Sequence, residues 1–385
     1  MSHGIECCFL INESTASPTQ QQKNNRGMTL KKFSLLTSVL MFLTACADSL
    51  GWLSRPQDPK DRNYRIEQVR FQGGDADITL AGELTMPFGQ GPFPAIILIT
   101  GSGPQDRNET IAGHKPFLVL SDFLTRNGFA VLRYDDRGVG ESTGTFSSEN
   151  RWKPTLRDFA QDAAAAYRFL QNIPAINQEK IGFLGHSEGG YIASVAAEFV
   201  PAAFMIFLAA PALPLLPDVM ATQVADIARS QGKSQQDIER EKALCRDLTE
   251  ILRTSPSVAD ARSQIEKRLQ SHGLTRAEIK ANMEVWGSDW GRHYASYDPL
   301  PAFRNFQHPV LALFGGSDLQ VSAAENAPVM KSLLTNPESE VLVLEKLNHL
   351  LQPSETGRIE DYILIDTTID PRVLNAISEW LSGIL

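Results

Sequence analysis

One serine of the chain stands where a catalytic nucleophile would be presented. Residues 185–190 read Gly-His-Ser-Glu-Gly-Gly; an apolar run typical of a buried strand precedes them, and small residues that favour a helix follow. A Gly-x-Ser-x-Gly turn between a strand and a helix is so sharp that only glycine fits on either side, and it lifts the serine side chain clear of the sheet. We therefore expect Ser187 to be the nucleophile, held in an elbow formed by Gly185, His186 and Gly189.

A serine hydroxyl becomes a good nucleophile only when a base removes its proton. Where such an elbow works with an acid and a histidine, the acid follows the serine along the chain and the histidine comes last. Asp318 follows an apolar run at 310–314, and His349 is the one histidine beyond that aspartate. We predict that His349 is the general base and that Asp318 orients its imidazole. Asp298 is the alternative acid, although an aspartate before proline is also common in a plain turn.

Two backbone N–H groups should stabilise the negative charge that develops on the substrate oxygen. The first donor expected is the N–H of Glu188, the residue after the nucleophile. The second should come from the loop at residues 101–107, Gly-Ser-Gly-Pro-Gln-Asp-Arg, where glycines allow the backbone to approach a substrate closely. Ser102 is the expected donor and Gly103 the alternative. Many hydrolases have His-Gly at the start of this loop, whereas this chain has Thr-Gly, which leaves the choice between the two open.

The elements that must hold these residues alternate between strand and helix. Two runs, 65–71 and 78–86, alternate apolar and polar residues around a Gly-Gly-Asp turn, which predicts an antiparallel pair. Six later runs are continuously apolar, as in parallel strands buried on both faces: 94–100, 129–134, 180–185, 204–209, 310–314 and 341–344. Helical stretches between them include 116–126, 156–170 and 189–199. The pattern predicts an α/β fold with a mostly parallel, eight-stranded sheet and helices on both faces.

Residues 211–300 break this alternation. The segment begins with several prolines, continues with charged stretches of helical period such as 235–251, and carries an aromatic cluster made of Trp286, Trp290, Tyr294 and Tyr297. It lies between the sixth and seventh predicted strands, so it would cover the carboxyl ends of the strands, where open α/β sheets bind ligands. We predict a helical cap over 211–300 and a core domain built from residues 64–210 and 301–385.

Four stretches together resemble those of bacterial α/β-hydrolase carboxylesterases of the serine-aminopeptidase-like branch: 101–107, 135–142 (Asp-Asp-Arg-Gly-Val-Gly-Glu-Ser), 185–190, and 348–350 (Asn-His-Leu). The resemblance covers about residues 65–385. It implies the α/β-hydrolase fold, a cap that shapes the pocket, and esterase activity on short to medium acyl chains. Asp135 and Arg137 are interpreted as structural residues of the turn after the fourth strand.

The leading hypothesis is a serine hydrolase in which a carboxylic ester, a small molecule, acylates Ser187 and water activated by His349 releases the acid, without a metal or a cofactor. A serine aminopeptidase or amidase is the first alternative. Such enzymes usually bind the substrate amine through an acidic residue of the cap, and this cap offers Asp226, Glu239, Glu241 and Asp247. The second alternative is a non-catalytic envelope lipoprotein that binds a ligand, although a binding protein has no use for a complete triad.

The N-terminal residues have the parts of an export signal. Two lysines precede a short apolar run at 33–43, and Leu-Thr-Ala-Cys follows. This ending resembles the lipobox of bacterial lipoproteins, which implies that Cys46 is lipidated and becomes the first mature residue. We expect residues 1–45 to be an upstream extension and a signal, and 46–63 to be a tether. The protein would then be lipid-anchored in the cell envelope, facing the periplasm or the exterior, and the uncharged residue after Cys46 favours the outer membrane. An ordinary cleaved signal is the alternative.

Composition narrows the classes of partner. The chain has 385 residues, of which 42% are hydrophobic, and a formal net charge of −9, so we expect no nucleic-acid partner. The four cysteines do not have the spacing of metal ligands, and Cys245 is expected to be a small buried apolar residue. No feature of the sequence predicts the natural substrate or the oligomeric state.

Overall fold

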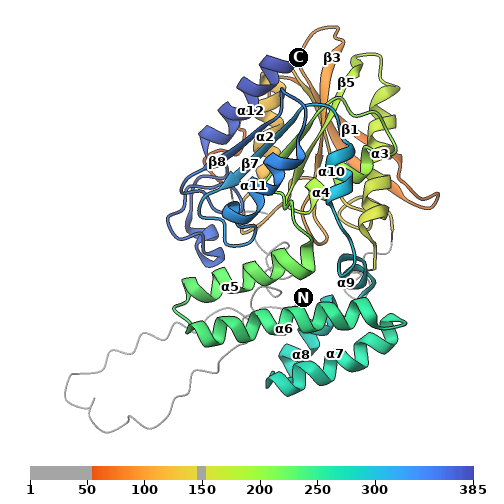
Figure 1. Ribbon diagram of the computed structural model, residues 1–385. Coiled ribbons are helices and arrows are strands. Elements are labelled where there is room, and N and C mark those ends of the chain that lie inside the picture. The colour runs from red at the N-terminus through yellow and green to blue at the C-terminus, as the bar shows by residue number, and fades with distance from the viewer. Residues whose placement is uncertain (1–53, 145–152) are drawn as a thin grey trace, which may run out of the picture. The chain divides into compact units, whose positions relative to one another are not determined.

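The computed structural model describes residues 54–144 and 153–385, which contain one eight-stranded sheet (Figure 1). β1 and β2 are antiparallel to their neighbours, and the other strands are parallel to one another. This confirms the predicted mostly parallel sheet. In spatial order the strands are β1 (Arg65–Gln72), β2 (Thr79–Met86), β4 (Ala130–Tyr134), β3 (Phe93–Ile99), β5 (Ile176–His186), β6 (Met205–Leu208), β7 (Val310–Gly315) and β8 (Glu340–Leu344).

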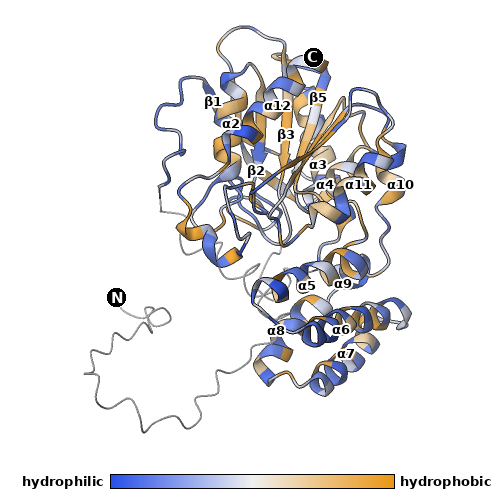
Figure 2. Ribbon diagram, turned by 60° about the vertical axis from the view of Figure 1, so that its left-hand side comes forward, coloured by the Kyte–Doolittle hydropathy of each residue, from blue (hydrophilic) through white to orange (hydrophobic). Residues whose placement is uncertain are grey.

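Helices cover both faces of the sheet. The central strands are apolar on both sides and appear orange in Figure 2, as the continuous apolar runs predict. In β7, Val310, Ala312 and Phe314 pack into one buried cluster, whereas Leu311 and Leu313 pack into the other. The first cluster includes α3 (Leu156–Gln171), α4 (Gly189–Ala196) and α11 (Ala323–Leu333), and the second includes α2 (Pro116–Arg126) and α12 (Pro371–Ile384).

The boundaries differ from the sequence expectation at two places that flank the nucleophile. β5 begins at Ile176, four residues before the predicted start at 180, because the polar residues 177–179 follow an isolated pairing of Ile176 with Phe93 across a register shift. The helix predicted over 189–199 ends at Ala196 and continues as turns. Neither difference moves Ser187 from the junction between β5 and α4.

Between β6 and β7 the chain is helical. A π-helical turn, η1 (Leu215–Val219), leads into the helices α5 (Met220–Ser230), α6 (Gln235–Thr254), α7 (Val258–His272), α8 (Arg276–Trp286) and α9 (Asp289–Tyr294). Figure 1 shows α5 to α8 gathered at one end of the sheet. The helices α6 to α9 each begin at a hydroxyl side chain that accepts a backbone N–H of the first turn, which satisfies a donor that the helix leaves unpaired: Ser234, Ser257, Thr275 and Ser288.

The short helix α10 (Leu300–Asn305) lies between these helices and β7, and it packs on the core. Its Phe303 ring contacts Phe207 of β6 and Tyr191 of α4, with ring centroids 5.6 and 6.1 Å apart. α10 therefore connects the helical segment to the sheet domain at the point where the sheet resumes.

Cys46, the predicted signal and the first part of the predicted tether lie outside the described residues. From Arg55 onward the chain contacts the core. The Arg55 guanidinium donates to the carbonyls of Ala112 and Ile363 at 3.0 and 2.9 Å, and Gln57 Oε1 accepts the N–H of Thr368 at 2.6 Å. Residues 55–57 of the predicted tether are thus bound to the core domain.

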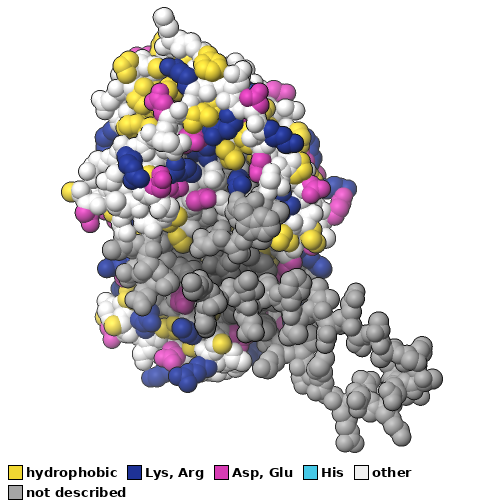
Figure 3. Space-filling view, turned by 180° about the vertical axis from the view of Figure 1, so that it is seen from behind, with side chains coloured by type: hydrophobic (Ala, Val, Ile, Leu, Met, Phe, Trp, Pro, Cys, Tyr) yellow, Lys and Arg dark blue, Asp and Glu magenta, His cyan; other side chains and the backbone are white. Residues whose placement is uncertain are grey.

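The surface of the described residues carries charges of both signs. Basic and acidic side chains are interspersed over the part of the back face that is not grey in Figure 3. Within 54–144 and 153–385, no helix is long and apolar enough to cross a membrane.

Candidate active site

Ser187 lies in a sharp turn at the carboxyl end of β5. Its φ is +53°, a conformation that costs a residue with a side chain free energy, and its N–H donates to the carbonyl of Leu208 on β6 at 2.9 Å. A Cβ on Gly185 would collide with the backbone of Gly189, and a Cβ on Gly189 would collide with the carbonyl of Ile99 on β3. The glycines are therefore required by the close approach of backbone segments, as the elbow motif predicts.

The structure brings the three predicted triad residues together. His349 Nε2 lies 3.0 Å from Ser187 Oγ, and His349 Nδ1 lies 2.8 Å from Asp318 Oδ2. Asp318 Oδ1 accepts the backbone N–H groups of Gln320 and Val321 at 2.7 and 2.9 Å, which fixes the carboxylate in the loop after β7. Asp318 and His349 are each 5% exposed, so the proton path from the serine to the histidine is largely shielded from water.

Asp298, the alternative acid, is elsewhere. It is exposed, and its Oδ1 accepts the N–H of Leu300 at 3.0 Å at the start of α10. This is the turn role expected of an aspartate before proline. The histidine has Asp318 as its carboxylate partner.

The loop at residues 101–107 begins beside the nucleophile. A Cβ on Gly101 would lie 3.2 Å from the Cβ of Ser187, so glycine is what allows the loop to pass this close. The N–H of Gly101 donates to Glu109 Oε1 at 2.7 Å and is thereby used within the protein. Ser102 and Gly103 follow it on the same loop, and Gly103 has a φ of +89°, which favours glycine.

Two buried aspartates, Asp135 and Asp136, fix the backbone of this loop through hydrogen bonds. Asp136 Oδ2 accepts the N–H of Gln105 at 3.0 Å, and its Oδ1 accepts the hydroxyl of Thr100 at 3.0 Å. Burial raises the pKa of the Asp136 carboxyl. Asp135 accepts both the backbone N–H and the guanidinium of Arg107, at 2.8 and 2.6 Å. Thr100, at the position where many hydrolases have histidine, therefore supports the loop.

Arg137 is bound away from the site. Its guanidinium donates to Asp162 Oδ2 on α3 at 2.7 Å and to Asp75 Oδ2 at 2.8 Å. These contacts tie the turn after β4 to α3 and to the β1–β2 loop. They agree with the interpretation of Asp135 and Arg137 as structural residues.

The side chain of Glu188 connects the elbow to the cap helices, a contact that sequence reasoning missed. Its Oε1 accepts the indole N–H of Trp290 at 3.0 Å and the hydroxyl of Tyr294 at 2.6 Å, both from α9. The residue is 2% exposed, and burial raises the pKa of the carboxyl, although the side chains of Ser102, Tyr294 and Trp290 favour its charged form. The aromatic residues were visible in the sequence, but nothing there indicated Glu188 as their partner.

His186 also has partners that the sequence did not indicate. Its Nδ1 lies 2.8 Å from Glu109 Oε1, and its Nε2 lies 3.0 Å from the carbonyl oxygen of His349. His186 is thus part of the elbow, as predicted, and also contacts the backbone of the histidine in the triad.

The acidic residues of the cap that could bind a substrate amine have partners of their own. Glu241 lies 3.2 Å from His272 Nε2, Asp247 accepts from Arg268 at 2.8 Å, and Glu239 accepts from Gln235 at 3.0 Å. Asp226 pairs with Arg229. Burial raises the pKa of the Asp226 carboxyl, the Arg229 charge lowers it, and the charges of Glu325 and Asp318 raise it further.

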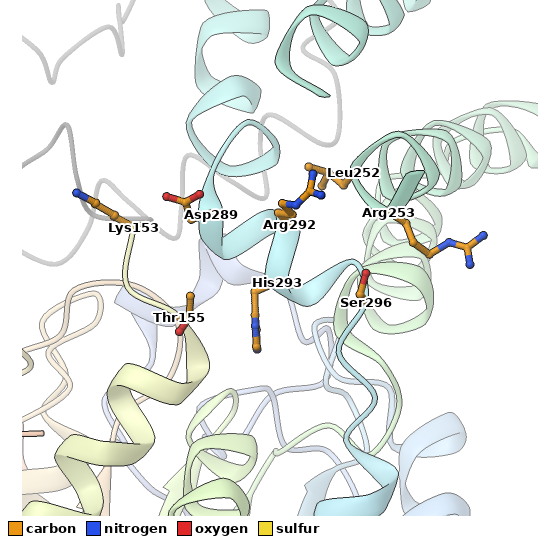
Figure 4. Close-up of a pocket in the computed structure, with 8 residues that line it drawn as sticks. All are labelled: Lys153, Thr155, Leu252, Arg253, Asp289, Arg292, His293 and Ser296. Carbon is orange, nitrogen blue, oxygen red and sulfur yellow. The ribbon is translucent and has the colours of Figure 1, made fainter. Parts of the chain in front are cut away.

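A pocket of about 600 Å³ lies where α9 meets the start of α3 (Figure 4). The residues of α9 that line the pocket do not include Trp290 and Tyr294. The pocket therefore lies on a different side of α9 from the contact with Glu188. The lining residues are Lys153, Thr155, Leu252, Arg253, Asp289, Arg292, His293 and Ser296.

Across residues 54–144 and 153–385, no group of three or more His, Cys, Asp or Glu side chains is arranged to hold a metal ion. Cys245 is a free, buried cysteine of α6, and burial raises the pKa of its thiol. It matches the expectation of a small apolar residue.

Comparisons with known proteins agree with the fold and with a hydrolase. The esterase EstD of Thermotoga maritima is 28% identical over 321 residues, which make up 82% of this chain and 69% of that protein. The α/β hydrolase GrgF from Penicillium sp. sh18 aligns with a TM-score of 0.51 at 18% identity, over 83% of this chain and 98% of that one. DcsB, solved in complex with its substrate analogue, aligns with a TM-score of 0.52 at 16% identity, over 83% of this chain and 100% of that one.

At these identities the two structures show the fold alone, and they confirm the predicted α/β-hydrolase fold. The family described as serine aminopeptidase, S33 matches residues 116–355, which is more than half of the chain. The chain therefore belongs to the serine aminopeptidase S33 family and is a hydrolase of the α/β-hydrolase fold.

Proposed function

We propose that this protein is a serine esterase that cleaves carboxylic esters with short to medium acyl chains. The observation that carries the proposal is the hydrogen-bonded series from Asp318 Oδ2 through His349 to Ser187 Oγ, with distances of 2.8 and 3.0 Å. The name of EstD, an esterase similar to this chain over most of its length, supports the ester as the substrate class.

In the first step, Ser187 Oγ attacks the carbonyl carbon of the ester while His349 Nε2 takes the hydroxyl proton. Asp318 accepts from Nδ1, so it keeps the imidazole in the tautomer that can receive this proton and stabilises the imidazolium that forms. The tetrahedral intermediate then collapses. His349 donates the proton to the leaving alcohol, and the acyl group stays on Ser187.

In the second step, water replaces the alcohol. His349 removes a proton from the water, whose oxygen attacks the acyl carbon, and the proton returns to Ser187 Oγ as the acid leaves. In both steps the carbonyl oxygen carries negative charge, which the N–H groups of Glu188 and of Ser102 or Gly103 would stabilise. Loss of one such donor costs on the order of 3 kcal/mol of transition-state stabilisation.

The test is an ester panel with the Ser187→Ala variant beside the wild type. Purified protein is assayed on p-nitrophenyl acetate, butyrate and octanoate. We expect turnover of these esters, and we expect Ser187→Ala to lower kcat by at least about a thousandfold. Comparable activity in the variant would move the nucleophile to another residue. If a fluorophosphonate probe did not label the folded wild type, the non-catalytic lipoprotein that binds a ligand would become the better hypothesis.

A serine aminopeptidase or amidase is the second candidate, and the family description favours it. It requires an acidic residue that binds the substrate amine, and Asp226, whose carboxyl pKa is raised by burial, is one of the four acidic candidates in residues 211–300. Aminoacyl p-nitroanilides measured in the same assay separate the two candidates. Turnover of the anilides without turnover of the esters would replace the esterase proposal.

We further propose that the protein is lipid-anchored at Cys46 in the cell envelope, facing the periplasm or the exterior. The support is the sequence before this cysteine, where two lysines, a short apolar run and Leu-Thr-Ala-Cys have the pattern of an export signal. Two or more acyl chains would give firm attachment, because each buried methylene contributes about 0.8 kcal/mol. Expression with labelled palmitate should label the wild type but not Cys46→Ser, and the variant should leave the membrane fraction. Equal labelling of both proteins would contradict the anchor.

A further inference from the structure

Two buried polar side chains lie directly behind the triad and take no part in the proton transfers described above. Glu109 is 1% exposed and His186 is 6% exposed. Glu109 Oε1 accepts the N–H of Gly101 at 2.7 Å and lies 2.8 Å from His186 Nδ1. His186 Nε2 lies 3.0 Å from the carbonyl oxygen of His349. One continuous series of hydrogen bonds therefore runs from the start of the 101–107 loop to the backbone of the triad histidine.

The protons of this series can be assigned from the acceptors at its ends. The carbonyl of His349 can only accept, so His186 Nε2 must donate to it. An ionised Glu109 can also only accept, which makes Nδ1 the second donor and His186 an imidazolium. Burial lowers the pKa of His186, but the Glu109 carboxylate and the His349 carbonyl more than offset this effect, and the pKa is raised. The raised pKa favours a doubly protonated His186 that donates to Glu109 Oε1 and to the His349 carbonyl.

We propose that Glu109 and His186 are positioning residues that hold the loop at residues 101–107 and the catalytic base, His349, in their positions beside Ser187. Glu109 accepts the N–H of the Thr100–Gly101 peptide, which lies one peptide before the N–H of Ser102, one of the expected donors. His186 orients the peptide that follows His349. The proposal rests on the proposed esterase function, because both of these elements act in the ester cleavage described above.

The backbone of Glu109 supports this role. Its φ is +52°, which is uncommon and unfavourable for a residue other than glycine. The turn around it is held by Asp106, whose Oδ1 accepts the N–H groups of Asn108 and Thr110 at 3.0 and 2.9 Å. The chain therefore adopts an unfavourable conformation at the point that delivers the carboxylate to Gly101 and His186. Displacement of reacting groups by about 1 Å can lower a rate by about a hundredfold, so side chains that fix the position of these groups help to maintain the rate.

The test compares Glu109→Gln with a matched variant in the cap. An uncharged amide oxygen can accept from Gly101, but it no longer balances a doubly protonated His186, so one of the two bonds should weaken. We expect kcat on p-nitrophenyl butyrate to fall by about tenfold to a hundredfold while KM stays within about twofold. The rate at which a fluorophosphonate labels Ser187 should fall in parallel.

Glu241→Gln is the matched control, because Glu241 and His272 form a second Glu–His pair on the cap helices α6 and α7. It should leave kcat and the labelling rate within about twofold of the wild type. An equal loss of kcat in both variants would overturn the proposal, and so would a folded Glu109→Gln with wild-type kcat.

His186→Gln is measured in parallel, so that the result does not depend on one variant being stable. Glutamine can reach Glu109 or the His349 carbonyl but not both. Because the two residues act as one unit, the double variant should lose about as much kcat as the more damaged single variant. Multiplicative losses would contradict a shared role. If the wild type cleaved no ester, the proposed function would fail, whereas the labelling rates of Ser187 would still rank these variants.

Discussion

The two sides of the candidate site are held by different kinds of contact. On the sheet side, backbone groups fix the reacting side chains: Ser187 donates its N–H to Leu208, and Asp318 accepts from two backbone N–H groups. On the cap side, the contact with the elbow joins side chains, since Trp290 and Tyr294 donate to the Glu188 carboxylate.

This difference determines how each side responds to substitution. A backbone N–H or carbonyl is present whatever the side chain at its position, so the bonds to Ser187 and Asp318 do not depend on the side chains of Leu208, Gln320 and Val321. A contact between side chains is lost with one substitution. A cap attached in this way can therefore change its lining while Ser187 and its partners keep their places.

The largest loss of activity is expected for Asp318→Asn, which disrupts the contact with His349 on the sheet side of the site. The new amide would present an N–H to His349 Nδ1, which favours the tautomer that cannot accept the Ser187 proton. The bonds from Gln320 and Val321 can persist, so the fold should change little. We expect kcat for p-nitrophenyl butyrate to fall by about 10³-fold to 10⁴-fold.

Asp298→Asn is the control for this variant, because Asp298 is exposed and precedes α10. Its kcat should stay within about twofold of the wild type. A large loss in Asp298→Asn together with a small loss in Asp318→Asn would reverse the assignment of the acid.

A smaller effect should come from weakening the cap side at Tyr294→Phe. The variant removes a hydroxyl that donates to Glu188 Oε1 at 2.6 Å. A typical hydrogen bond contributes about 0.5–1.5 kcal/mol to stability, so the melting temperature should fall. We expect KM to rise by about threefold to tenfold while kcat changes by less than about threefold, because the triad keeps its backbone contacts.

Tyr297→Phe is the matched control. Tyr297 follows α9, and its buried hydroxyl has no hydrogen-bond partner among the described residues. Removal of that hydroxyl should leave KM unchanged and should leave the melting temperature equal or higher. If Tyr294→Phe lowered kcat as strongly as it raised KM, the cap would support the chemistry as well, and the separation of the two sides would be wrong.

The same division explains what the sequence could predict. Six strands were predicted from continuously apolar runs, and the first two from alternation around a turn. The three residues that the structure brings together, Ser187, Asp318 and His349, were predicted because each follows an apolar strand in a fixed chain order. The elbow glycines were found because the turn admits nothing larger. These are local patterns, or local patterns combined with order along the chain.

The contacts that sequence reasoning missed join residues far apart. Glu109 and His186 are 77 residues apart, Glu188 and Trp290 are 102 apart, and His186 and His349 are 163 apart. A buried carboxylate finds its donors only when the chain has folded, and a single glutamate among polar neighbours carries no periodicity. The aromatic residues 290 and 294 were visible at helical spacing, but their common partner was not.

The smallest effect is expected for Glu188→Gln, as a change in melting temperature that depends on pH. Burial raises the pKa of the Glu188 carboxyl in the folded protein above its ordinary value. Between the unfolded and the folded pKa the unfolded chain is ionised while the folded one holds a proton, so the wild type loses stability as pH rises through that window. Glutamine cannot ionise, yet its amide oxygen still accepts from Trp290 and Tyr294.

The melting temperature of Glu188→Gln minus that of the wild type should therefore increase by a few degrees between about pH 4 and pH 8. Glu239→Gln, at an exposed position of α6, should show no such trend. A difference that decreased with pH would mean that the fold stabilises the Glu188 anion. The cap would then be held to the elbow by charge, and its contact would be as firm as the backbone contacts on the sheet side.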